Sequence, residues 1–415
     1  MPKVLSYARN APAWREQICH VADLRSPVQS ATMNESRSDN MDHPQHRKAP
    51  IRSRKVLAGL LLKTATVAAI TLGLMPSNAS FGANKLDIVV FGDSLMDAGT
   101  YSPFAKAKFG GGRFTTNPGL NFTQLVARFY GSELTPAFVG GFGLLLVPVG
   151  GGDYAQGGSR VTMQPGVDHA TAGSSNADFA EETTIPVKDQ VAEFLKAHER
   201  FSPDQLVLIN GGANDILFQL TAAQAAGTAQ AQQDALKAIT QSALDLADIV
   251  GTIVKSGATH VVVINMPDLG KAPKGVASAD HGQSFTQVSQ SFNTTLAGAL
   301  RQQDLGEKVL LIDSFSFVDG VIANFQQHGF EVSNTAFACD LSDQVMKATN
   351  LHLDNPSAFG QSLFCSPQTY VGMGADQTFM FADDVHPSTH LNALIAEFVE
   401  QQIKKQHWKL QGQPT

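Results

Sequence analysis

The sequence predicts an α/β fold in which helices cover both faces of a parallel sheet. Short runs rich in Val, Ile and Leu recur along the chain without polar alternation, as in strands that are buried on both faces. Longer segments suited to helices separate these runs, and strand, helix, strand repetition is typical of an open α/β sheet. Polar and Gly-rich motifs follow the runs, at the strand ends where ligands bind in such sheets.

Four segments are predicted strands, and five are predicted helices. The strands are 86–91, 206–210, 260–265 and 308–313. The helices are 121–130, 186–199, 222–256, 284–303 and 387–406. Two other segments, the Gly-rich 135–166 and the later 336–380, are interpreted as functional loops or small insertions.

The distribution of charge argues against a nucleic-acid partner. Residues 1–55 contain 10 Lys or Arg and 5 Asp or Glu, whereas the rest contains 20 and 32, a formal charge of −12. Binding to a nucleic-acid backbone depends on clustered Lys and Arg. We therefore expect no nucleic-acid partner for the acidic body of the chain.

The N-terminal region is predicted to hold an export signal. Residues 1–54 are polar and look structureless, either a genuine extension or a stretch before a later start such as Met41. Residues 55–79 resemble a signal peptide, because basic residues precede the apolar stretch 56–75 and small residues surround Ala79.

A membrane anchor is the competing interpretation of that apolar stretch, since about 20 residues can span a bilayer. Lys63 and the many Thr and Ala residues weaken it, and the small residues that follow favour cleavage. We expect one domain at 80–415 that is secreted or periplasmic.

Two of the three cysteines lie in the expected exported domain. Cys339 and Cys365 are an even pair in an oxidising compartment, and we predict a disulfide between them. The alternative is two unrelated buried thiols. The sequence has no CxxC motif or Cys/His cluster, and His386 and His390 lack the Glu of an HExxH motif, so we expect no metal.

Ser94 is the candidate nucleophile, because it follows the first predicted strand where a turn into a helix would begin. His386 is the candidate general base, since imidazole titrates near neutral pH. Asp383, three residues earlier, can reach the Nδ1 side of that ring, and Asp384 is the less well placed alternative. On their own, Ser94 would suit a helix cap and His386 a structural role.

Three groups are candidate donors to an oxyanion: the N–H of Ser94, the side-chain amide of Asn214 and the N–H of Gly158. Gly157 is the alternative to Gly158. Carboxylates that flank the motifs are expected to hold turns by hydrogen bonding and to have no catalytic role; they are Asp93, Asp97 and Asp215.

Four sequence blocks together resemble the GDSL, or SGNH, hydrolase family. They are FGDSLMDAG, DYAQGGSR, GGAND and DDVHP, in the family order between residues 86 and 398. The resemblance implies a flavodoxin-like three-layer α/β/α sandwich and hydrolysis of esters or thioesters. It also implies Ser94 as nucleophile, His386 as base and Asp383 as its partner, with Ser94, Gly158 and Asn214 as oxyanion donors. The blocks look most like those of secreted bacterial lipases and esterases, and we expect a free, monomeric enzyme without a cofactor.

Two other classes are less consistent with the sequence. An α/β-hydrolase needs GxSxG around its nucleophile, which is not found at Ser94. A non-catalytic binding protein on the same fold would have lost one of the serine, histidine or asparagine residues, and all are present.

The substrate is the least determined part of the prediction. The apolar loop 137–148 is expected either to line a site for an acyl chain or contact a lipid surface transiently, or to pack internally. An ester or lipid substrate is therefore expected, with a carbohydrate acetylesterase or a lipid acyltransferase as alternatives on the same site.

Overall fold

Within residues 85–168 and 182–412, which the computed structural model describes, four strands form a parallel sheet. In spatial order they are β1 (Ile88–Phe91), β4 (Leu206–Ile209), β5 (His260–Ile264) and β6 (Val309–Ile312). The predicted α/β class and the four predicted strands are confirmed. The predicted extension 1–54 and signal peptide 55–79 lie outside the described residues.

A short segment extends the sheet beyond the free edge of β1. Val90 forms a parallel bridge with Asp153, and its N–H and C=O pair with Gly152 and Tyr154 at 2.9 and 2.8 Å. Numbered by chain order within this sheet alone, β1 is strand 1, this segment is strand 2, and β4, β5 and β6 are strands 3 to 5. Their spatial order is then 2-1-3-4-5, the order of flavodoxin-like sheets.

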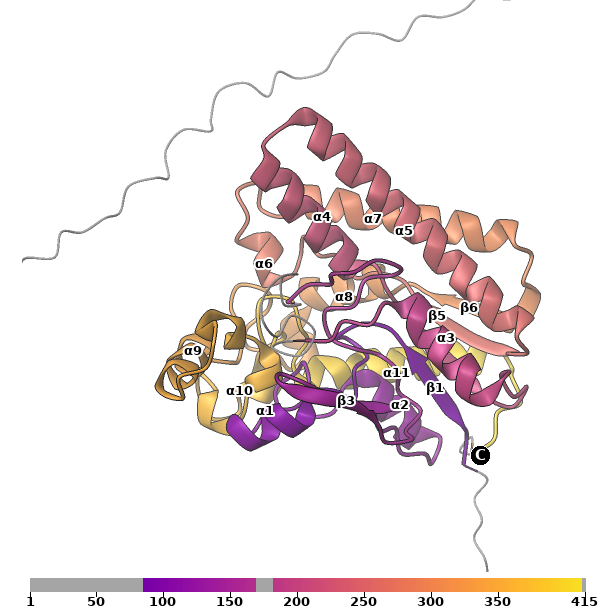
Figure 1. Ribbon diagram of the computed structural model, residues 1–415, viewed down its shortest axis with the longest axis horizontal. Helices are drawn as coiled ribbons and strands as arrows, with labels where there is room; N and C mark the ends of the chain where they lie inside the picture. The colour runs from indigo at the N-terminus through magenta and orange to yellow at the C-terminus, as the bar shows by residue number, and fades with distance from the viewer. Residues whose placement is uncertain (1–84, 169–181, 413–415) are drawn as a thin grey trace, which may run out of the picture. The chain divides into compact units, whose positions relative to one another are not determined.

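Alternate residues of the strands contribute to two cores, because successive side chains of a strand point to opposite faces. Val89 and Val207 belong to the core on one face. Residues of three helices complete that core: α3 (Val187–His198), α5 (Ala229–Lys255) and α7 (Gln283–Gln302). Val90 and Leu208 belong to the core on the other face, which α2 (Phe122–Phe129) and α11 (Thr389–Lys405) cover. The helices therefore lie on both sides of the sheet (Figure 1).

The predicted helix 222–256 is wrong in its boundaries, because the chain forms two helices there. α4 (Ala213–Ala226) begins within the GGAND block, at its alanine, and ends before Gly227, which has a left-handed φ of 65°. α5 then begins with Thr228 as its N-cap, whose side chain accepts the N–H of Ala231 at 3.1 Å. Glycine ends a helix readily because it adopts left-handed φ at no steric cost.

The two predicted insertions have secondary structure of their own. Segment 135–166 contains the antiparallel hairpin of β2 (Phe138–Gly141) and β3 (Leu144–Pro148). Segment 336–380 contains α9 (Leu341–Asn350), α10 (Ala375–Thr378) and three 3-10 turns, Pro356–Phe359, Ser362–Phe364 and Pro367–Thr369. Both insertions meet α1 (Ser102–Lys108) in one aromatic cluster that includes Phe104, Phe142, Phe359 and Phe364. The other elements are α6 (Pro273–Val276), α8 (Ser314–Ala323) and 3-10 turns at Gly306–Lys308 and Phe325–His328.

Cys339 and Cys365 form a disulfide, as the sequence predicted. Among the described helices, none is both long and apolar enough to cross a membrane.

Candidate active site

Four loops converge at the carboxyl edge of the sheet. The Ser94 loop follows β1, and Gly158 lies in the loop after the short segment beside β1. Asn214 lies in the first turn of α4, just after β4, and His386 lies shortly before α11. All four residues line one cavity of about 640 Å³. The structure thus brings together the residues that the sequence singled out.

Ser94, His386 and Asp383 form a chain of hydrogen bonds. Nε2 of His386 lies 2.7 Å from Oγ of Ser94, and its Nδ1 lies 2.7 and 2.9 Å from the two carboxylate oxygens of Asp383. His386 is 9% exposed and Asp383 is 2% exposed. With the ring proton on Nδ1, Nε2 is free to accept the proton of the serine hydroxyl.

Asp384, the alternative partner, is directed elsewhere. Its Oδ2 lies 2.6 Å from Nζ of Lys274 at the rim of the cavity, and both side chains are partly exposed. The ring of Phe114 lies against the imidazole of His386, with 5.1 Å between the two ring centroids. Of the two carboxylates, Asp383 is therefore the one that is hydrogen-bonded to His386.

The electrostatics favour a charged pair between Asp383 and His386. Burial opposes the charged ring, but the carboxylates of Asp383, Asp384 and Asp93 outweigh this effect and raise the pKa of His386. Burial also favours the neutral acid at Asp383, but the nearby imidazole and hydrogen bonds hold the pKa of this carboxyl well below its usual range. The carboxylate can thus stabilise an imidazolium as it forms.

The candidate oxyanion donors differ in how they are held. Gly157 donates its N–H to Oδ2 of Asp97 at 3.0 Å and does not line the cavity, whereas Gly158 does. Within the described residues, the N–H groups of Ser94 and Gly158 donate to no protein acceptor. Asn214 donates one amide hydrogen to the carbonyl of Ser159 at 2.9 Å, which leaves its second hydrogen for another acceptor. This arrangement favours Gly158 over Gly157.

Three buried carboxylates hold these loops together, and their role is wider than the local turns that the sequence suggested. Asp97 accepts the N–H groups of Gly99, Thr100 and Gly157, which joins the Ser94 loop to the Gly158 loop. The carboxylate of Asp93 accepts a hydrogen bond from the side-chain Nδ2 of Asn210 at 3.0 Å. In return, the backbone N–H of Asp93 donates to the side-chain Oδ1 of Asn210 at 3.2 Å.

Asp215 makes the third connection, between α4 and the Gly158 loop. Its Oδ2 accepts the N–H of Val161 at 2.9 Å, and its Oδ1 pairs with Nε of Arg160 at 3.2 Å. Asp215 is the next residue after Asn214. Its contacts with the Gly158 loop therefore also fix the position of the Asn214 amide.

The cavity has one apolar wall and one polar end. The wall is a face of α4, and its residues recur at helical spacing: Ala213, Leu217, Phe218, Thr221, Ala222 and Ala225. The polar end includes Asp168, Glu182 and the Lys274–Asp384 pair. The sequence analysis missed this wall, although the apolar positions after the GGAND block follow a helical spacing that could have indicated it.

The hairpin predicted to bind an acyl chain does not line this cavity. Phe142 is buried in the aromatic cluster, whereas Leu145, at 70% exposure, points outward together with Leu144 and Val147. The expectation that this loop lines the acyl site is therefore not met. Phe142 is packed inside the protein, whereas the exposed side chains of Leu144 and Leu145 could contact a lipid surface.

Within the described ranges, no cluster of three His, Cys, Asp or Glu side chains is arranged to hold a metal ion. Nδ1 of His390, the residue four positions after His386, lies 2.7 Å from the carbonyl of Gln377.

Comparison with known proteins agrees with the geometry. A family model described as GDSL-like Lipase/Acylhydrolase matches residues 88–399. A GDSL esterase/lipase of Arabidopsis thaliana is 25% identical over 331 residues, which cover 74% of this chain and 84% of the relative. The phosphatidylcholine-sterol acyltransferase of Aeromonas hydrophila is 26% identical over 349 residues, covering 76% and 91%. Lipase 1 of Photorhabdus luminescens is 22% identical over 359 residues, covering 75% of this chain and 49% of the lipase.

Gly158→Ala is expected to destabilise the fold more than Gly131→Ala. The two glycines have nearly the same left-handed φ, 73° and 72°, but a Cβ at Gly158 would lie 2.2 Å from the carbonyl oxygen of Val167, whereas Gly131 has nothing within 4 Å. Gly131→Ala should cost about 1 kcal/mol of unfolding free energy, from the left-handed φ alone. Denaturant unfolding of both variants measures the difference, and equal losses would show that the Gly158 contact is unimportant.

Proposed function

The chain belongs to the GDSL-like lipase/acylhydrolase family, and on this premise we propose that it hydrolyses carboxylic esters with Ser94 as the nucleophile. The observation that carries the proposal is the 2.7 Å contact between Oγ of Ser94 and Nε2 of His386, whose other ring nitrogen meets the buried carboxylate of Asp383. A hydroxyl so placed can lose its proton to the ring as it attacks a carbonyl carbon.

The proposed reaction has two halves. In the first, Oγ of Ser94 bonds to the ester carbonyl carbon, and His386 takes the hydroxyl proton and passes it to the leaving alcohol oxygen as the ester C–O bond breaks. In the second, a water molecule gives a proton to His386 and attacks the acyl-serine, and Ser94 regains its proton as the carboxylic acid leaves. Asp383 keeps the ring oriented and stabilises its charged form in both halves.

The negative charge on the substrate oxygen in each half needs hydrogen-bond donors. We assign this role to the N–H groups of Ser94 and Gly158 and to the side-chain amide of Asn214, which line the same cavity. Fixed donors are effective because they need no reorganisation as the charge develops.

The apolar face of α4 supports an acyl chain as the part of the substrate held in the cavity. From Ala213 to Ala225 this wall extends about 18 Å, at 1.5 Å per residue. A carbohydrate acetylesterase has no use for such a wall, since an acetyl group occupies only its first turn. We therefore favour a lipid or other long-chain ester.

Acyl transfer is a second candidate, favoured by the similarity to the acyltransferase of Aeromonas hydrophila. An acyl-serine does not determine which hydroxyl attacks it, so an alcohol that reaches Ser94 in place of water would be acylated. The same residues would carry both reactions.

We also propose that the enzyme is exported. The Cys339–Cys365 disulfide supports an oxidising compartment, consistent with the predicted signal peptide at 55–79. Transient contact with a lipid surface would use the exposed apolar side chains of the β2–β3 hairpin, Leu144, Leu145 and Val147.

Ser94→Ala or His386→Ala should reduce esterase activity by several orders of magnitude in a folded protein, because each removes part of the proton-transfer pair. Asn214→Ala, which removes one oxyanion donor, should reduce kcat about 10²–10³-fold. The measurement is hydrolysis of p-nitrophenyl esters, with a phosphonate probe mapped to its residue by mass spectrometry. Full activity in folded Ser94→Ala, or a label on another residue, would refute the assignment.

The pH profile should reflect the raised pKa of His386. The ring must be neutral to accept a proton, so kcat/KM should fall on the acid side with a midpoint above the ordinary histidine value of about 6.5. Asp383→Asn should lower kcat about 10⁴-fold and move this midpoint to lower pH, since the carboxylate that raises the pKa is gone. A midpoint that stays in place would contradict the proposed role of Asp383.

Ala222→Trp, in the middle of the α4 wall, should lower the ratio of kcat/KM for palmitate to that for acetate esters at least tenfold. Each methylene group of the acyl chain that loses its apolar contact costs about 0.8 kcal/mol of binding free energy. The loss of two such contacts is therefore enough for a tenfold change in the ratio. Leu145→Ser, on the exposed hairpin, is the control and should leave this ratio unchanged for soluble esters. The reverse result, with the hairpin variant alone losing long-chain activity, would place the acyl site at the hairpin.

A further inference from the structure

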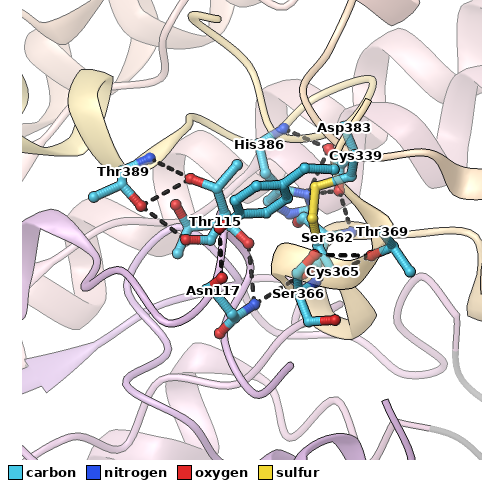
Figure 2. The surroundings of a disulfide bond; sticks show 12 residues. Thr115, Asn117, Cys339, Ser362, Cys365, Ser366, Thr369, Asp383, His386 and Thr389 are labelled. Carbon is cyan, nitrogen blue, oxygen red and sulfur yellow. Dashed lines mark hydrogen bonds and ion pairs between the residues drawn. A yellow bond between two sulfur atoms is a disulfide. The ribbon is translucent and has the colours of Figure 1, made fainter. Parts of the chain in front are cut away.

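The disulfide lies directly against the residues that hold His386. Cys339, Cys365 and Ala382 form a small cluster from which solvent is excluded, and Ala382 immediately precedes Asp383. The N–H of Cys339 donates to the carbonyl of Ala382 at 3.0 Å, and the N–H of Ala382 donates to the carbonyl of His386 at 2.8 Å. One half of the disulfide thus supports the backbone of the loop that contains Asp383 and His386 (Figure 2).

The other half of the disulfide supports a hydrogen-bond donor to the carboxylate itself. The backbone N–H of Ser362 donates to Oδ2 of Asp383 at 2.7 Å, and Cys365 closes the same 3-10 turn by donating its N–H to the carbonyl of Ser362 at 3.0 Å. Figure 2 shows Ser362, Asp383 and the sulfur–sulfur bond side by side.

The donor from Ser362 differs in origin from the other donors to this carboxylate. Oδ1 of Asp383 accepts the N–H groups of Val385 and His386, which belong to the same local turn. Oδ2, which also meets Nδ1 of His386, receives its backbone N–H from a segment 21 residues away in the sequence. The backbone N–H that fixes the second carboxylate oxygen is therefore available only if that segment stays in place.

The segment that carries Ser362 is weakly supported by regular structure. Between α9 and α10 it forms only three 3-10 turns, of three or four residues each. Besides the disulfide, two hydrogen bonds hold it: the side-chain amide of Asn117 donates to the carbonyl of Ser362 at 3.1 Å, and the N–H of Gly112 donates to the carbonyl of Leu363 at 2.8 Å. Leu363 and Phe364 are also buried in the aromatic cluster. The disulfide adds a covalent link from this turn to Cys339, whose N–H is hydrogen-bonded to the loop that contains Asp383, so it restrains the turn directly against that loop.

We propose that the Cys339–Cys365 disulfide is a positioning device for the reaction: it holds the N–H of Ser362 on Asp383, and so keeps the carboxylate in the orientation that His386 requires. The inference rests on the proposed function. The chain with free thiols then folds but is a poor enzyme, and it gains full activity when both thiols are oxidised. That step transfers two electrons and two protons from the thiols to a disulfide oxidant such as oxidised glutathione.

The test compares the wild type with the Cys339→Ala/Cys365→Ala double variant. Losing a hydrogen bond to a charged group should reduce kcat about 10–100-fold, with KM within about twofold. The pKa of His386, followed by NMR of its ring protons, should fall, because a displaced Asp383 no longer raises it. A folded double variant with wild-type kcat and an unchanged His386 pKa would overturn the proposal.

Two further variants separate positioning from general stability. Val250→Ala removes packing from a fully buried position of α5 and should lower Tm while leaving kcat and the His386 pKa as in the wild type. Ser362→Pro removes the N–H and keeps both cysteines, and Gln361 already has the extended conformation that a following proline requires. It should reproduce the loss of kcat and the lower pKa with the disulfide intact. If the double variant does not fold, wild-type protein reduced with dithiothreitol replaces it, and wild-type kcat and His386 pKa in the folded, reduced protein would likewise overturn the proposal.

Failure of the proposed function would look different. A wild-type protein that neither cleaves p-nitrophenyl esters nor takes the phosphonate on Ser94 would refute ester hydrolysis. The NMR pKa of His386 would still show whether the disulfide positions Asp383, because that measurement does not depend on turnover.

Discussion

Buried carboxylates that accept backbone N–H groups join the loops at the carboxyl edge of the sheet, and the rest of the site depends on these bonds. Loops after parallel strands have no ladder partners, and an unpaired buried N–H is costly. Asp97 alone accepts three such groups, and Asp215 accepts one from the Gly158 loop. Because these acceptors belong to different loops from many of their donors, satisfying the backbone also brings Ser94, Gly158 and Asn214 together.

The buried carboxylates of the site fall into two electrostatic kinds. Burial raises the pKa values of Asp93, Asp97 and Asp215, and it outweighs their hydrogen bonds and, at Asp215, the pairing with Arg160. The pKa of Asp383 is instead lowered, because its partner His386 can carry a positive charge. Of these carboxyl groups, the one beside the candidate base His386 is thus shifted toward its charged form.

The insertions contribute more to the site than to the sheet. The 336–380 segment brings the disulfide and Ser362 to Asp383, and the aromatic cluster that it forms with α1 and the hairpin also contains Phe114, whose ring lies against His386. The apolar wall of the cavity, in contrast, is a face of α4, which follows β4 after a short loop. Because α4 also contains Asn214, this one helix supplies both a candidate oxyanion donor and the apolar wall.

Local patterns in the sequence were sufficient to predict the four strands of the parallel sheet and the helices α2, α3, α7 and α11. Apolar runs without alternation can be satisfied only in a sheet covered on both faces, so β1, β4, β5 and β6 were predictable within a few residues. The break at Gly227 was missed, because the helical spacing of apolar residues continues on both sides of it.

The sequence by itself determined the residue types for acyl transfer and their order along the chain, since each of the four blocks is local. Only the tertiary structure decided which atoms meet. The choice between Asp383 and Asp384 depends on Lys274, and the choice of Gly158 over Gly157 depends on Asp97. The contact of Ser362 with Asp383 joins segments 21 residues apart, and such a contact follows from packing, which no local pattern encodes.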